Sequence, residues 1–499
     1  MDVIYIIGPM LLIAVVLAAV WLDRWSVPVI LVALGAGIVF GSDVLNLWNF
    51  GDMHLTNQVA NIALVFILFH GGFCTRRDTM KSVALPALGL ATWGVILTAA
   101  VTFAVLYKVL GWSFEKSVLL AVIISSTDAA ATFSILRRQS LPSKLSSTVE
   151  IESAANDPMA ILMTLVAVQG FTSGQSQWYI VILSFFWKFT AAPLLGWFLA
   201  KAALWLYNRL CPQDRGHYYV LSLGVILLIY GLAELIHASG MLAVFVAGFI
   251  MGNHSFVHKQ GVFNFSSALS TMANIGMFAL MGLLVFPHQW STLWLDGIVL
   301  FVVLTLAARP AAVWLGTLGM GINWKNKLFI MWAGLRGAVP IVLATYPAAA
   351  DMAIGQDIFN LVFFAVLLSI LVQGSTLGLA AKRLGLSTPS QPKPLFNLEL
   401  ITMAESDLDL VVVDLPGPKG VPGAMIRDLQ LPPEALITMI TRGKEVIPPK
   451  GSTCLQGWDH VTVLAHGKDE GAVRQALLAP FEQISKELTS GHQGVLESV

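Results

Sequence analysis

The sequence predicts an all-α polytopic membrane protein with a small α+β cytosolic domain near its C-terminal end. Of its 499 residues, 56% are hydrophobic and only 12% are charged, whereas about a quarter of the residues of a soluble chain are charged. Apolar segments of about 20 residues, long enough to cross a bilayer, recur through most of the chain. A membrane β-barrel would show shorter segments of alternating hydrophobicity instead, so we expect membrane-spanning helices.

The apolar segments predict thirteen transmembrane helices. The first is too long for the core of a signal peptide and has no basic start, so we interpret it as a span. Pro28 and nearby glycines mark natural helix boundaries around the second span, which is short. The predicted spans cover residues 3–22, 27–41, 58–73, 83–107, 115–136, 146–169, 178–206, 217–236, 240–252, 267–286, 294–317, 326–346 and 356–381.

Lysine and arginine residues in the loops predict the orientation in the membrane. One side receives only Lys108 and Lys116. The other side receives Arg24, Arg76, Arg77, Lys81, Arg137, Arg138, Lys144, Arg209, Arg215, Lys259, Lys325, Lys327, Lys382 and Arg383. The basic side is expected to face the cytoplasm of a bacterial inner membrane. The N-terminus is then periplasmic and the C-terminal domain cytoplasmic.

The composition changes after the last span. We expect a transmembrane domain over residues 1–385, a proline-rich linker over 386–397, a cytosolic domain over 398–482 and a polar tail over 483–499. Segments rich in β-branched residues predict three strands, and two further segments predict helices. The expected strands are residues 408–415, 435–441 and 461–465, and the expected helices are 425–429 and 471–478.

The fifth span contains the polar run Ser125-Ser126-Thr127-Asp128 in its middle. A carboxylate in hydrocarbon costs about 2.5–3.5 kcal/mol even on the gentler insertion scales, so an intramembrane charge indicates function. Hydroxyls and the carbonyls of an unwound backbone suit a partly dehydrated monovalent cation. Discontinuous helices of this kind mark binding sites near the midplane of secondary transporters. Packing of the hydroxyls against neighbouring helices is the alternative.

The sixth span carries Glu152, Ser153, Asn156 and Asp157, followed by Pro158. Residues four apart share a helix face, so Ser153 lies with Asp157 and Glu152 with Asn156. Burial favours the protonated form of a carboxylate. A proton and a cation can therefore compete for the same oxygens, which is what exchange requires. We expect Asp157 to be this shared carboxylate.

A buried positive charge must balance these groups. Arg336 lies in the glycine-flanked twelfth span, and an arginine in mid-membrane needs a partner. Glu152 is the first candidate partner and Glu150 the second. Arg309 either positions the eleventh span or pairs with Glu150, and His70 is either structural or a proton sensor.

These residues carry a resemblance to the monovalent cation:proton antiporters of the NhaP type. The matching stretches are Ser126–Ala129, Glu152–Pro158 and Gly334–Ala338. The resemblance covers about residues 1–385. It implies thirteen helices with inverted repeats, two crossed broken helices (the fifth and twelfth) and a homodimer. It also implies an elevator-like alternating access in which a core part moves against a dimerisation part.

The resemblance also implies roles for individual residues. Asp157 takes the position of the shared proton and cation carboxylate. Thr127, Asp128 and Ser153 take those of further cation ligands, so that the monovalent cation is held at Asp157 and Asp128. Asn156, which we also count among the cation-binding residues, occupies the asparagine position that is typical of electroneutral members. Glu152 and Arg336 correspond to a structural ion pair. His70 stands near a position where many relatives have an acidic residue.

The cytosolic domain resembles the C-terminal half of potassium-conductance regulatory domains, the TrkA-C type (RCK_C). Residues 421–429, 445–451 and 458–461 carry this resemblance. It implies a dimerising module that often binds a small regulatory ligand, of unknown identity here. A plain structural cap is the alternative. The association with potassium systems favours K⁺ as the substrate.

The predicted function is therefore exchange of cytoplasmic K⁺ for external H⁺, with Na⁺ as a further candidate substrate, a role in pH homeostasis and no cofactor. An Na⁺(Li⁺)/H⁺ antiporter of the same fold is the first alternative. A cation channel gated by the cytosolic module is another, but no glycine-rich filter sequence is evident. A membrane enzyme would need a catalytic motif that we do not find. The three cysteines fit no metal spacing, and zero net charge gives no basic surface for nucleic acid. The expected partners are membrane lipid and a second copy of the chain.

Overall fold

The computed structural model describes residues 2–22, 28–41, 43–47, 51–77, 83, 85–87, 89–128, 141–173, 178–210, 214–285, 287–387, 398, 408–416 and 420–481. The chain divides into two compact units. The first comprises Met1–Leu206, Gly216–His254 and Phe263–Thr388, and the second comprises Tyr207–Arg215, Ser255–Val262 and Pro389–Val499. Most of the predicted linker, the tail, and residues 129–136 of the predicted fifth span lie outside the described residues.

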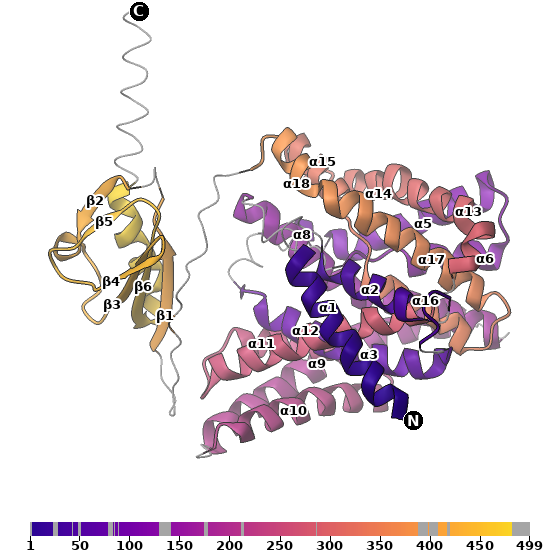
Figure 1. Cartoon of the computed structure of the whole chain (residues 1–499), viewed down its shortest axis with the longest axis horizontal. Helices are drawn as coiled ribbons and strands as arrows, with labels where there is room; N and C mark the ends of the chain where they lie inside the picture. Colours follow the sequence, from indigo (N-terminus) through magenta and orange to yellow (C-terminus); the bar gives the residue numbers. More distant parts are fainter. Residues whose placement is uncertain are drawn as a thin grey trace, which may run out of the picture. The chain divides into compact units, whose positions relative to one another are not determined.

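Helices make up nearly all of the first unit (Figure 1). The first half of the chain forms α1 (Asp2–Leu22), α2 (Val29–Phe40), α3 (Met53–Cys74), η2 (Leu90–Gly94), α5 (Val95–Ala104), η3 (Val105–Val109), α6 (Phe114–Ile123), α8 (Ser143–Ser173) and α9 (Trp178–Leu210). The second half forms α10 (Gly216–Leu235), α11 (Gly240–Gly252), α12 (Lys259–Leu283), η4 (Pro287–Gln289), α13 (Trp290–Val303), η5 (Leu304–Ala308), α14 (Arg309–Gly316), α15 (Trp324–Trp332), α16 (Ala338–Ala349), α17 (Gly355–Ser369), η6 (Ile370–Gly374) and α18 (Ser375–Arg383).

Helical segments lie within each of the predicted spans. Among the described residues, eight helices are long and apolar enough to cross a membrane, and four apolar helices are shorter. The shorter group includes α2, α11 and α16. The polytopic helical class is therefore confirmed. The number of thirteen transmembrane helices and the inverted repeats stay predictions.

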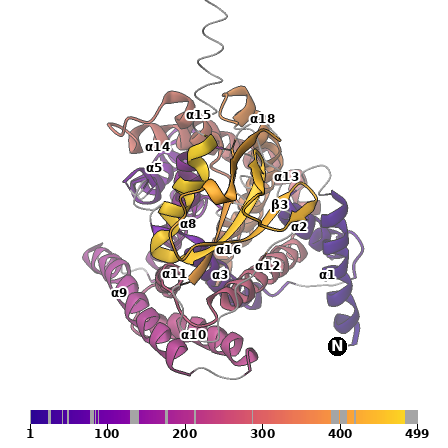
Figure 2. The same ribbon diagram turned by 90° about the vertical axis from the view of Figure 1, so that its left-hand side faces the viewer.

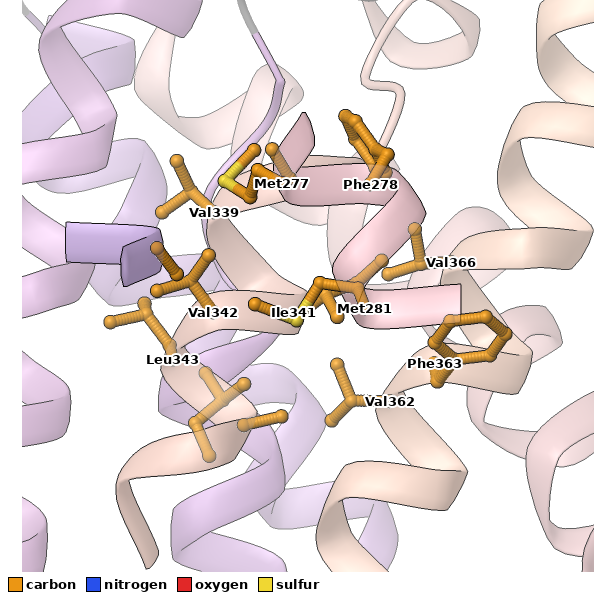
Figure 3. Close-up of a cluster of buried hydrophobic side chains, with 14 of the residues drawn as sticks. Met277, Phe278, Met281, Val339, Ile341, Val342, Leu343, Val362, Phe363 and Val366 are labelled. Atoms are coloured by element: carbon orange, nitrogen blue, oxygen red, sulfur yellow. The ribbon is translucent and has the colours of Figure 1, made fainter. Parts of the chain in front are cut away.

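Two features bring the helices close together. Gly72 of α3 and Gly248 of α11 lie against each other's helices so closely that a Cβ atom on either would overlap backbone atoms. Side chains of α12, α16 and α17 meet in a buried cluster that includes Met281, Ile341 and Phe363 (Figure 3). Because lipid is as apolar as these side chains, close packing rather than exclusion of water holds such helices together.

The C-terminal part of the chain forms the predicted small α+β domain. Its four-stranded antiparallel sheet has the order β1-β6-β3-β4, and β2 pairs with β5 in a second sheet. The strands are β1 (Leu408–Asp414), β2 (Pro422–Met425), β3 (Leu436–Arg442), β4 (Glu445–Ile447), β5 (Cys454–Gln456) and β6 (Asp459–His466). The three predicted strands are confirmed as β1, β3 and β6. The short strands β2, β4 and β5 were not predicted, because three or four residues give too little alternation to recognise.

One helix covers the larger sheet. Residues 470–481 are helical (Figure 2). Val473, Leu477 and Phe481 of this helix join the core that the strands bury. The predicted helix over 425–429 is only a short 3₁₀ turn, Ile426–Asp428. The fully buried Asp459 accepts hydrogen bonds of 2.8 and 2.7 Å from Arg442, and these bonds raise the pKa of the guanidinium. This ion pair fastens β3 to β6.

Candidate functional site

The C-terminal end of one helix and the break in another meet at the centre of the site. α6 ends at Ile123, and the chain continues without helical structure to Asp128. The twelfth predicted span is broken into α15 and α16, which are separated by residues 333–337. Asp128 links the segment after α6 to this break, because its backbone N–H donates to the carbonyl of Leu335 over 2.8 Å. The predicted break in the twelfth span is thus observed, and the polar run of the fifth span lies against it.

The carboxylate of Asp128 caps α16. Its Oδ2 accepts a hydrogen bond of 3.0 Å from the backbone N–H of Ala338, the first residue of that helix. The first N–H groups of a helix have no partner within it, and a negative charge there is favourable. A side chain at Gly337 would overlap this carboxylate, so glycine is required at that position. One oxygen of Asp128 is therefore already used by the protein.

Arg336 caps the C-terminal end of α6. Its Nη1 donates to the carbonyl of Ser125 over 2.7 Å and also to that of Ser126. These carbonyls belong to the turn that follows α6, where backbone acceptors lack helical partners. A positive charge is favourable at this end of a helix. Each segment therefore supplies the charge that caps the other helix. Asp128 caps the start of α16, and Arg336 caps the end of α6.

The predicted ion pair between Glu152 and Arg336 is wrong, because Arg309 is the partner of Glu152. Arg309 Nη1 and Nη2 donate to the two carboxylate oxygens over 2.5 and 3.1 Å, and Nη2 also donates to the carbonyl of Ile330 over 3.2 Å. Both side chains are buried, with exposed fractions of 4% for Arg309 and 0% for Glu152. A side chain at Gly334 would overlap the Arg309 guanidinium, so the break also makes room for this pair.

The alternative pairings with Glu150 are also wrong. The Nη groups of Arg309 donate to Glu152 and to the carbonyl of Ile330. Arg336 donates to the carbonyls of Ser125 and Ser126. Glu150 instead accepts a hydrogen bond of 2.9 Å from Ser146, one turn earlier on α8.

Three of the predicted cation ligands form one hydrogen-bonded cluster. The hydroxyls of Thr127 and Ser153 are 2.9 Å apart. Asn156 Nδ2 donates to Thr127 Oγ1 over 2.6 Å, and its Oδ1 accepts from the Thr127 backbone N–H over 3.3 Å. The three residues are no more than 1% exposed. The structure therefore brings the polar face of α8 onto the segment that follows α6.

Asp157 lies beside this cluster on α8 and is 3% exposed. Its Oδ1 is buried without a hydrogen-bond partner among the described residues. The charges of Asp128 and Arg336 act on it electrostatically. A buried carboxylate oxygen that the protein does not satisfy is costly and is available for a proton or a cation. Carboxylate and hydroxyl oxygens together are suited to a hard monovalent cation.

His70 lies away from this cluster. Its ring contacts Ser266 and Phe263, which belong to α12, and Cys74 one turn later on α3. The hydrogen bond between His70 Nδ1 and Ser266 Oγ is 3.1 Å long. These contacts favour the structural interpretation of His70 over a part in cation binding.

Two buried residues of the site were not predicted. Ser369 and Gln373 contact the break between α15 and α16. Their signal in the sequence was a pair of polar residues four apart in an otherwise apolar span, which places both on one face.

Known proteins share this architecture. Residues 11–383 match the family described as "Sodium/hydrogen exchanger, transmembrane". The K(+)/H(+) antiporter NhaP2 of Shewanella sp. (strain MR-4) is 34% identical over 470 residues, which are 93% of this chain and 81% of that protein. The K(+)/H(+) antiporter NhaP of Alkalimonas amylolytica is 30% identical over 469 residues, with the same shares of 93% and 81%.

The structure resembles that of the sodium proton antiporter MjNhaP1 from Methanocaldococcus jannaschii at pH 8. The TM-score is 0.67 at 23% sequence identity, and the match covers 77% of this chain and 99% of that one. At this identity the likeness establishes the fold alone. It confirms the predicted antiporter fold for the helical part of the chain.

Proposed function

Because the chain belongs to the sodium/hydrogen exchanger family, and is thus a cation/proton antiporter and not an enzyme, we propose that it exchanges K⁺ for H⁺ at Asp157. One observation carries this proposal. Asp157 presents a buried, unsatisfied carboxylate oxygen beside the cluster of Thr127, Ser153 and Asn156. A proton and a partly dehydrated cation compete for that oxygen, so the carboxylate carries one or the other.

The proposal assigns the remaining polar groups as follows. Thr127, Ser153 and Asp128 complete the cation site, and the carboxylate of Asp128 also holds α16 in place. Asn156 carries no charge, and we assign the carboxylate of Asp128 to the cap of α16, which leaves Asp157 to gain and lose one proton for each cation. Exchange of one proton for one monovalent cation moves no net charge. We therefore expect electroneutral exchange.

The choice of K⁺ follows from relatives that match most of this chain. The Shewanella and Alkalimonas proteins are named K(+)/H(+) antiporters, and both alignments cover 93% of this chain. That share extends past the transmembrane family match, which ends at residue 383. We further propose that the domain after residue 398 is a regulatory module of the TrkA-C type, that the protein is a homodimer with a periplasmic N-terminus, and that alternating access is elevator-like.

Purified protein in proteoliposomes tests the proposed exchange. An inside-acid pH gradient is imposed, and K⁺, Na⁺ or Li⁺ is added outside over a pH series while the internal pH is recorded. We expect K⁺ to dissipate the gradient with the lowest apparent KM, and a membrane potential set by a thiocyanate gradient to leave the rate unchanged. Better exchange with Na⁺ or Li⁺ would refute the choice of K⁺, clear voltage dependence would refute electroneutrality, and cation uptake without proton movement would indicate a channel.

A further inference from the structure

The apolar stretch Gly355–Arg383 changes from α-helix to π-helix and back next to the break between α15 and α16. α17 ends at Ser369, the π-helical turn η6 (Ile370–Gly374) follows, and α18 completes the stretch. Ser369 and Gln373 are polar residues at this turn, and they are 0% and 2% exposed. Short π-helical turns within α-helices are frequent at functional sites, and polar residues buried at membrane depth are costly unless they are paired.

Both side chains bind backbone groups at the break between α15 and α16, Ser369 within it at Arg336 and Gln373 at Trp332, the last residue of α15. The backbone N–H of Arg336 donates to Ser369 Oγ over 3.0 Å. The Ser369 hydroxyl in turn donates to Gln373 Oε1 over 2.5 Å. Gln373 Nε2 donates to the carbonyl of Trp332 over 3.4 Å. The three hydrogen bonds form a chain that begins and ends on the broken segment.

These bonds complete the pairing of the backbone at the break. An interrupted helix leaves carbonyl and N–H groups without helical partners, and each buried group left unpaired is costly. Asp128 pairs with the Leu335 carbonyl and the Ala338 N–H. Ser369 and Gln373 pair with the Arg336 N–H and the Trp332 carbonyl. Two elements therefore pair with the backbone at the break between α15 and α16. One is the segment after α6, and the other is the junction of α17 and η6.

We propose that Ser369 and Gln373 are positioning residues for the cation site. They fix the backbone of Arg336, and through it the guanidinium that holds the carbonyls of Ser125 and Ser126. Those carbonyls immediately precede Thr127, which contacts Ser153 and Asn156. Loss of the chain of hydrogen bonds frees the Arg336 backbone to shift and displaces Thr127 from its partners. The proposal rests on the cation site at Asp157 and adds to it a third element, η6.

Replacement of Ser369 by alanine or of Gln373 by methionine tests this proposal. The proteoliposome assay gives the apparent KM for the cation and the kcat per transporter for Ser369→Ala, Gln373→Met and the double variant. We expect each single change to raise KM by about tenfold, with kcat within about twofold of the unchanged protein. We also expect the double variant to resemble either single one, because both changes interrupt one hydrogen-bonded chain. Ser369→Cys, which keeps the size and a weaker donor, should give an intermediate KM.

The matched control is Ser375→Ala on the adjoining helix. Ser375 is exposed, and its hydroxyl bonds carbonyls of its own helical stretch, so its KM should not change. A fall in kcat at unchanged KM in the Ser369 and Gln373 variants would overturn the proposal, since it would indicate only a smaller folded fraction. Fully additive effects on KM in the double variant would overturn it too. If Ser369→Ala does not assemble, the KM values of Ser369→Cys and Gln373→Met test the proposal in its place. Retained exchange in Asp157→Asn would instead refute the cation site itself.

Discussion

Asp157→Asn is expected to abolish exchange, so that cation addition dissipates a pH gradient no faster than in vesicles without protein. Asparagine has nearly the size and shape of aspartate, but its amide neither gains nor loses a proton in this pH range. The variant also loses the negative charge that balances a bound cation. Both halves of the exchange depend on the one carboxylate, so a partial loss is not expected. The measurement is the rate of dequenching of a pH-sensitive dye in proteoliposomes.

The matched control is the same change at Asp351. That residue is exposed and has a left-handed backbone conformation, with φ of 54°, which asparagine adopts readily. Asp351→Asn should therefore fold and transport like the unchanged protein. Binding of the cation to Asp157→Asn can be followed separately by calorimetry in detergent. Exchange at the normal rate in Asp157→Asn, with normal assembly, would show that another group carries the proton.

The sequence predicted the residues of this site better than their pairing. Thr127, Ser153, Asn156 and Asp157 stand out because polar groups in an apolar span are costly, and helical spacing places Ser153 on one face with Asp157. Pairing of the buried charges depends on where the helices end. The sequence predicts Glu152 as the partner of Arg336, because an arginine in mid-membrane needs a counter-charge. In the structure Arg336 Nη1 instead donates to the carbonyls of Ser125 and Ser126.

The contribution of η6 was missed for a related reason. A serine and a glutamine in an apolar span predict only a polar contact with a neighbouring helix. The identity of that neighbour depends on tertiary packing. Ser369 meets the backbone N–H of Arg336, a group that becomes available only because the twelfth span is interrupted there. Polarity and periodicity predict that Ser369 and Gln373 share one helix face. Their partners depend on where the twelfth span is interrupted, which the sequence of their own span does not indicate.

The Glu152–Arg309 pair is expected to have the second large effect, on stability. Replacing one member of a buried ion pair leaves the other charge uncompensated, which typically costs about 3–5 kcal/mol. We expect Glu152→Met to be the more damaging single change, because a guanidinium stays charged whereas a buried carboxylate can become neutral by binding a proton. Arg309→Met should therefore destabilise less. The measurement is the midpoint of thermal unfolding of the purified protein in detergent.

A double-mutant cycle distinguishes the observed pair from the one that the sequence predicted. Removing both charges in Glu152→Met with Arg309→Met should recover much of the stability lost in Glu152→Met, because an apolar pair of similar volume can replace a buried ion pair. The same cycle with Arg336→Met should be closer to additive, since Arg336 donates to backbone carbonyls instead. The control pair is Lys116 with Asp296, which are 3.3 Å apart but 23% and 41% exposed, and exposed pairs contribute about 0–1 kcal/mol. Strong coupling of Glu152 to Arg336, with none to Arg309, would contradict the observed pairing and restore the predicted one.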